Sequence, residues 1–342
     1  MNISNLVVVL SALLMFSGCG NAQTENKNVS ASGSNIKETS EVRLAKPITV
    51  IDSSRYKILM QKMFNGDSSG KWNFNGHYPL PGAILPFHRV IAYYGNLYST
   101  RMGILGELPK PQMFAKLKSE MEVWKKADPE TPVMPALHYI VTTAQGSPGP
   151  SGKYRLRMPN KEIDKVLAMA EEIGAVVFLD IQVGLSNLRE EIPVIEKYLL
   201  HPKVHLGIDP EFSMKGGERP GSVIGHFTAV DINYATQYLA DIVTKNNLPP
   251  KMLVVHRFTQ NMVKDYRQIV LRPQVQVVVD MDGWGAPARK INTYKQFAYR
   301  EPIQFTGFKL FYKNDLKEPP HRMLTAKELL SLKPAPMYIQ YQ

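Results

Sequence analysis

Short apolar segments that alternate with helical stretches are the feature that most limits how this chain can fold. Buried parallel strands read as continuous apolar runs, and a strand–helix unit repeated eight times over about 250 residues is the pattern of a (β/α)8 barrel. Eight such segments begin at Arg89, Val133, Val176, Val204, Met252, Val275, Ile303 and Met337. We therefore predict an α/β fold of the TIM-barrel type, formed by a single domain over residues 51–342.

Helical spacing fills the intervals between these strands. The predicted outer helices cover residues 111–125, 160–172, 187–200, 228–246, 259–270, 289–299 and 325–332. A further helix at 52–64 precedes the first strand, with Asp52 or Ser53 placed to cap it. Because no outer helix follows the last strand in this sequence, we expect the early helix to cover the bottom or the side of the barrel.

The first 18 residues are typical of a bacterial lipoprotein signal. They carry no charged side chain, and residues 6–16 form an apolar run too short to span a bilayer. The run leads into Ser17-Gly18-Cys19, which resembles the lipobox, in which a lipidated cysteine becomes the new amino terminus. The alternative is an apolar leader with an incidental cysteine. Residues 19–50, rich in Asn, Ser, Thr, Lys and Glu, are predicted to be the lipidated Cys19 and a disordered linker.

Composition narrows the choice of partners. Cys19 is the only cysteine, so the barrel has neither a disulfide nor a thiol nucleophile. The chain carries 41 Lys and Arg against 30 Asp and Glu, a net charge of +11 that favours anionic lipids and acidic glycans, although a solvated basic surface explains it equally. No nucleic-acid-binding motif is present. We expect a monomer in the cell envelope, anchored to the membrane through Cys19, that acts on a glycan or cell-wall polysaccharide.

Chemically active side chains stand at the carboxyl ends of the predicted strands, where barrels of this type carry their active sites. These strand-end residues are Tyr94, His138, Asp180, Asp209, Glu211, His256, Asp280, Asp282, Lys309, Gln340 and Tyr341. Residues two apart in a strand share a face, so Asp209 and Glu211 are expected to face the barrel mouth together. With Asp180 they form a predicted carboxylate cluster in which mutual repulsion retains a proton.

Such a cluster suits glycoside hydrolysis, which needs one protonated and one ionised carboxyl group. Glu211 is the predicted acid, and Asp209 or Asp180 its partner. An Asp-x-Glu at the fourth strand resembles muramidase-type and chitinase-type glycosidases, although strand one ends in Tyr93-Tyr94-Gly95, where muramidase-type barrels carry an acid. The other strand-end residues are candidates for substrate binding. Trp284 joins them as a predicted platform for a sugar ring, with a packing role as the alternative.

Other interpretations of the same residues stay open. One is a carbohydrate-binding lipoprotein that performs no catalysis. Another is a metal-dependent hydrolase, because Asp180, Asp209, Glu211, His256 and Asp280 offer oxygen and nitrogen ligands to a divalent ion, although no His-x-His or His-Glu-x-x-His motif is present. Otherwise we expect no cofactor. His256 is alternatively a neutral histidine bonded to a carboxylate, and Lys309 either a Schiff-base lysine or, more simply, the partner of an acid.

Several motifs in order carry a resemblance to a family. They are YYGN…MGILGE, VVFLDIQVG, GIDPEF, NNLP…VVHRF and the terminal YIQYQ, which together span most of residues 87–342. In these motifs the chain resembles an uncharacterised family of bacterial secreted proteins and lipoproteins with a glycoside hydrolase-like barrel. The resemblance implies an exported barrel and supplies no activity.

Overall fold

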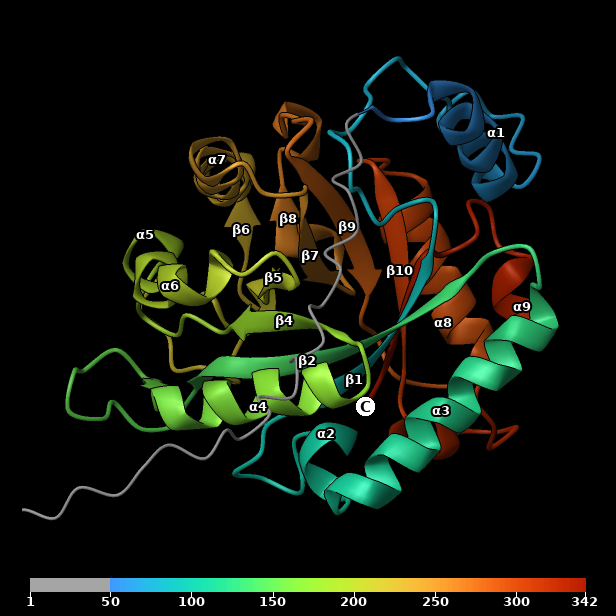
Figure 1. Cartoon of the computed structure of the whole chain (residues 1–342). Coiled ribbons are helices and arrows are strands. Elements are labelled where there is room, and N and C mark those ends of the chain that lie inside the picture. The colour runs from blue at the N-terminus through green and yellow to red at the C-terminus, as the bar shows by residue number, and fades with distance from the viewer. Residues whose placement is uncertain (1–49) are drawn as a thin grey trace, which may run out of the picture. The chain divides into compact units, whose positions relative to one another are not determined.

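The eight predicted strands form a closed parallel barrel in the computed structural model, which describes residues 50–342 (Figure 1). In the order in which they pair, the strands are β1 (Arg89–Gly95), β11 (Tyr338–Tyr341), β10 (Phe305–Leu310), β9 (Val275–Met281), β7 (Lys251–Arg257), β5 (Val204–Ile208), β4 (Val176–Ile181) and β2 (Val133–Ala144). Pairing of β1 with β2 closes the ring. The (β/α)8 prediction is therefore confirmed. The predicted signal at 1–18, Cys19 and the linker up to residue 49 lie outside the described residues.

The other elements surround this barrel. The helices are α1 (Ser53–Phe64), α2 (Ile104–Glu107), α3 (Lys110–Ala127), α4 (Asn160–Glu172), α5 (Leu188–Glu191), α6 (Glu196–Leu199), α7 (Ala229–Asn246), α8 (Pro287–Tyr294) and α9 (Ala326–Leu330). The short 3-10 helices are η1 (Ile192–Ile195), η2 (Pro210–Phe212), η3 (Gln260–Met262), η4 (Tyr266–Gln268) and η6 (Asn314–Leu316), and η5 (Lys295–Tyr299) is a π-helix. Strand β3 (Arg155–Arg157) pairs antiparallel with β2, and β6 (Phe227–Thr228) pairs with β8 (Val263–Lys264). None of the helices over residues 50–342 combines the length and hydropathy that a membrane span requires.

Alternation along the strands divides the apolar side chains between two cores. Outward-facing residues such as Leu137 and Val255 pack beneath the outer helices, of which α3, α4 and α7 are seen around the strands in Figure 1. Inward-facing residues such as Ala92, Phe178 and Val254 fill the lower part of the barrel. Successive side chains of a strand point to opposite faces, so each strand contributes to both cores.

Helix α1 closes the bottom of the barrel, as predicted. Its buried residues Tyr56 and Met60 belong to the same apolar cluster as Val90 and Met252, which lie near the amino ends of their strands. The predicted cap is present, because the Asp52 side chain accepts a hydrogen bond from the Arg55 backbone N–H at 2.9 Å. The lower end is thus sealed by apolar packing, which leaves the upper end for polar chemistry.

Three helix predictions need correction. The helix predicted at 259–270 is wrong: Asp265 adopts a left-handed conformation (φ 58°), and the chain forms two 3-10 turns with β8 between them. The helix predicted at 187–200 is broken into α5, η1 and α6 around Pro193, which has no N–H to donate. The helix predicted at 289–299 starts earlier, at Pro287, and changes to a π-helix at Lys295.

Candidate functional site

A pocket of about 650 Å³ opens at the carboxyl ends of the barrel strands. Six of the residues predicted for the site line it: Tyr94, Asp209, Glu211, Asp282, Trp284 and Lys309. The sequence prediction missed other lining residues, which include Arg101, Gln182, Phe212, Phe258 and Arg289. The mixture of carboxylates, cations and aromatic rings gives the pocket both a polar and an apolar surface.

Asp209 and Glu211 enter this pocket from the turn that follows β5. Asp209 caps η2, with its Oδ1 accepting a hydrogen bond from the Glu211 backbone N–H at 3.0 Å. Its Oδ2 accepts one from Gln182 Nε2 at 3.2 Å. The two carboxyl groups therefore share the pocket because of a turn, and not because of the extended strand that we predicted. Within residues 50–342, neither forms an ion pair with a lysine or arginine.

The surroundings of this pair favour retention of a proton. Burial raises the pKa of Asp209 well above its usual value, and repulsion from Glu211 and Asp180 adds to this shift against the opposing effect of His256. Burial also raises the pKa of Glu211, to about 7, with a further contribution from Asp282. A carboxyl group with a pKa near neutrality is suited to donate a proton at physiological pH.

Asp282 has a different environment, because it forms an ion pair with Lys309. The Lys309 Nζ lies 2.9 Å from Asp282 Oδ1 and 3.8 Å from the centre of the Tyr94 ring. Burial raises the pKa of Asp282, but the positive charges of Lys309 and His256 outweigh it and lower the pKa. Lys309 thus pairs with an acid of the cluster, which is the simpler of its two predicted roles.

Five of the predicted site residues lie beneath the pocket and do not line it. These fully buried residues are His138, Asp180, His256, Asp280 and Gln340. The prediction that Asp180 acts directly on a substrate therefore needs correction. Asp180 is the register partner of Gly207, two residues before Asp209, so it sits lower in the barrel. The Tyr94 hydroxyl also donates a hydrogen bond to Asp180 Oδ2, at 3.2 Å.

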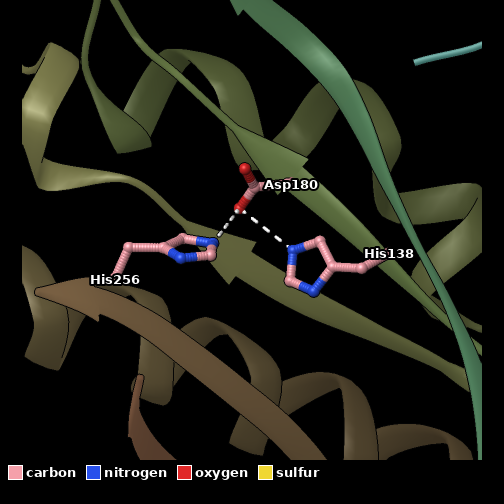
Figure 2. A group of neighbouring side chains, drawn as sticks. All are labelled: His138, Asp180 and His256. Atoms are coloured by element: carbon pink, nitrogen blue, oxygen red, sulfur yellow. Dashed lines mark ion pairs between the residues drawn. The ribbon is translucent and has the colours of Figure 1, made fainter. Parts of the chain in front are cut away.

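Asp180 lies between two imidazole rings (Figure 2). Its Oδ1 is 3.3 Å from His138 Nε2 and 3.4 Å from His256 Nε2. Burial lowers the pKa of His138 to about 4, which makes this ring neutral. Burial also lowers the pKa of His256, but the negative charges of Asp180 and Asp282 outweigh burial and hold this pKa well above its usual value. His256 therefore differs from the neutral histidine of the alternative prediction.

Trp284 and Tyr341 are two aromatic residues predicted for the site, and only Trp284 lies in the pocket. Trp284 lines the pocket with 44% of its surface exposed, which agrees with a stacking surface better than with a packing role. The prediction that Tyr341 binds substrate is wrong. This residue points away from the pocket into the outer core, where its hydroxyl accepts a hydrogen bond from Trp124 Nε1 at 3.0 Å. Its neighbour Gln340 faces inward, so alternation directs Tyr341 outward.

Gln182 is the missed residue that the sequence could have identified. It follows Asp180 by two positions, and its amide links Asp209 with the Tyr94 hydroxyl, at 3.2 and 3.5 Å. The same period-two argument that we applied to Asp209 and Glu211 would have selected it. Arg101 and Arg289 come from a loop and from helix α8, and no strand-end pattern indicates them.

Neither the comparison with protein-family models nor the comparison with curated proteins found a match to this chain. The site therefore has to be interpreted from its own geometry and chemistry.

Proposed function

We propose that this protein is a glycoside hydrolase-like enzyme that acts on a glycan or cell-wall polysaccharide, with Glu211 as the proton donor and Asp209 as its carboxylate partner. The observation that carries the proposal is the presence of both carboxyl groups in one pocket, without a cationic partner in the described part of the chain. Asp282, the third acid of the pocket, is neutralised by Lys309.

The pocket offers the other features that a sugar requires. Pyranose rings stack on aromatic faces while their hydroxyl groups form hydrogen bonds. Trp284, Phe212 and Phe258 supply apolar surface, and Gln182 and Arg289 supply polar groups. A carbohydrate-binding protein without catalysis would need the same surfaces, but it would not need two unpaired acids.

Assignment of the acid role to Glu211 follows from its position. Glu211 is only partly buried, whereas Asp209 is 2% exposed and holds hydrogen bonds from two groups. The more accessible carboxyl group is the better candidate to reach a glycosidic oxygen. In glycosidases the second carboxyl group serves as nucleophile or base, so Asp209 acts in its ionised form while Glu211 holds the one proton that the pair shares.

The proposed setting is the cell envelope. The lipobox-like segment that ends at Cys19 and the resemblance to secreted bacterial proteins support export and attachment to a membrane surface. The net charge of +11 supports approach to anionic polymers of that compartment.

The test is a hydrolysis and binding screen of the purified protein against polysaccharides and peptidoglycan. Glu211→Gln is expected to lower kcat by about 100-fold or more while binding is retained. Glu218→Gln is the matched control, because Glu218 is an exposed acid of the loop after η2 that does not line the pocket. Full activity of Glu211→Gln would refute the proposed acid. Binding without turnover by the unmodified protein would favour the carbohydrate-binding alternative.

A further inference from the structure

Three ligand-type atoms converge beneath the pocket. His138, Asp180 and His256 each offer one ligand atom, these atoms lie within 4.8 Å of one another, and all three side chains are fully buried (Figure 2). His138 Nε2, Asp180 Oδ1 and His256 Nε2 have no hydrogen-bond partner among the described residues. Unpaired buried polar atoms are unfavourable, and three that face one another point to a ligand that they share.

The two nitrogen–oxygen distances at Asp180 Oδ1 match those expected between two ligands of one metal ion. Charge-assisted N–H···O bonds measure about 2.8 Å. Two ligands of one tetrahedral ion, each about 2.1 Å from it, stand about 3.4 Å apart. Asp180 Oδ1 is 3.3 Å from His138 Nε2 and 3.4 Å from His256 Nε2, which agrees with the metal spacing.

The remaining polar atom of each residue lies beside a polar group of another residue. His256 Nδ1 lies 3.1 Å from Asp282 Oδ2, and His138 Nδ1 lies 2.5 Å from the Tyr338 hydroxyl. The Tyr94 hydroxyl donates a hydrogen bond to Asp180 Oδ2. Metal-bound histidines commonly donate their other ring N–H to a carboxylate or another acceptor, which fixes the ring orientation. His138 Nε2, Asp180 Oδ1 and His256 Nε2 therefore face one another, while the other polar atom of each residue faces Tyr338, Tyr94 or Asp282.

Space and charge also favour a cation. A Cβ at position 207 would lie 2.4 Å from Asp180 Oδ1 and 2.5 Å from His138 Nε2, so Gly207 keeps the area beside both atoms open. Four buried acids surround the cluster, namely Asp180, Asp209, Asp280 and Asp282. Within residues 50–342, Lys309 is the one lysine or arginine that pairs with any of them. These carboxylate oxygens favour a cation over an anion at the cluster.

We propose that His138, Asp180 and His256 bind one divalent transition-metal ion beneath the pocket floor. Two imidazole nitrogens and one carboxylate oxygen favour Zn²⁺, Co²⁺ or Fe²⁺, whereas Mg²⁺ and Ca²⁺ prefer sets composed of oxygen. A set of three protein ligands is typical of metal sites that keep a further coordination position. This inference does not depend on glycoside hydrolysis.

The test measures metal uptake by the full-length protein after treatment with a chelator. Titration with Zn²⁺ and with Co²⁺ is expected to give one ion per chain, with a visible absorption band for Co²⁺ that excess Mg²⁺ leaves unchanged. At a free Zn²⁺ concentration about 100 times the Kd, the Tm is expected to rise by about 4 °C.

Variants locate the ion. Asp180→Asn and His256→Gln are expected to weaken binding by more than about 100-fold, and Tyr338→Phe by about 10-fold to 100-fold. His205→Gln is the matched control, since His205 is another buried barrel histidine, whose Nδ1 accepts a hydrogen bond from the Met252 N–H at 3.1 Å. It is expected to retain one ion per chain.

Two results would overturn the proposal. One is failure of the unmodified protein to take up Zn²⁺ or Co²⁺ in stoichiometric amounts. The other is unchanged binding in folded Asp180→Asn or His256→Gln protein, which would place the ion elsewhere. If circular dichroism shows that both variants are unfolded, Tyr338→Phe decides the location, because unchanged binding in this folded variant would place the ion away from His138. This test does not measure hydrolysis. A failure of the metal proposal can therefore be distinguished from a failure of the proposed function.

Discussion

The substitution Asp128→Asn should destabilise the lower end of the barrel. Asp128 Oδ2 lies 2.8 Å from Arg89 Nη1, and Asp128 Oδ1 lies 2.9 Å from Lys62 Nζ. The Arg89 side chain is 3% exposed, so its charge has little contact with water. Asp128 therefore joins helix α1, through Lys62, to the start of β1 and compensates a buried cation.

The size of the expected loss in the free energy of unfolding follows from the pKa of Asp128. Burial raises this pKa, but hydrogen bonds, including those from Lys62 and Arg89, outweigh burial and lower the pKa to about 2. Against an unfolded value of about 3.9, the shift corresponds to about 2.6 kcal/mol of the free energy of unfolding at neutral pH. The substitution also leaves Arg89 without its anion, which adds to the loss. We expect a total of about 3 kcal/mol.

Thermal and urea denaturation at pH 7 measure this loss. For a domain of this size, about 3 kcal/mol corresponds to a decrease in Tm of about 5 °C. Glu130→Gln is the matched control, because Glu130 also contacts Lys62, at 3.0 Å, but its side chain is 82% exposed. Exposed ion pairs contribute little, so the control should change Tm by less than about 1 °C.

The pH dependence provides a second check of the same reasoning. The folded-state pKa of Asp128 is depressed, so its contribution is complete above the unfolded pKa and is lost as the pH falls from about 5 towards 2. The difference between the native protein and Asp128→Asn should therefore decrease over this range. Equal effects of Asp128→Asn and Glu130→Gln at pH 7 would refute the argument that burial makes the Asp128 contacts strong.

Three further predictions concern the site, a buried lysine and a helix cap. If Glu211 is the proton donor, hydrolysis should fall as the pH rises through about 7, its raised pKa, and a pH–kcat profile measures this. Burial lowers the pKa of Lys251 to about 7, so the free energy of unfolding should increase by on the order of 3 kcal/mol from pH 7 to pH 10 relative to Lys251→Met, as urea denaturation would show. Thr228→Ala removes the capping box of α7 and should cost about 1 kcal/mol in the same assay.

Prediction from the sequence succeeded where a local pattern has one structural outcome. Apolar runs such as 176–181 became buried strands, and Asp52 became the cap of α1, because strand burial and capping depend on neighbours in the chain. It failed at 259–270, where helical spacing competed with the pairing of β8 and β6, a contact between residues that are distant in sequence.

The site shows the same division. That Gln340 and Tyr341 point in opposite directions follows from strand geometry alone, and the prediction that both belong to the site overlooked this rule. The depth of Asp180 is different in kind, because it depends on the register between β4 and β5. The register between neighbouring strands is fixed only when the barrel is assembled.

The amino-acid sequence by itself determined the barrel class, the strands and the carboxyl ends at which acids and histidines gather, because each rests on periodicities of a few residues. Only the tertiary structure decided which of these groups reach the pocket and which lie beneath it. Closure of the barrel sets the height of every inward side chain, so Asp209 and Glu211 line the pocket while Asp180 meets His138 and His256 below it.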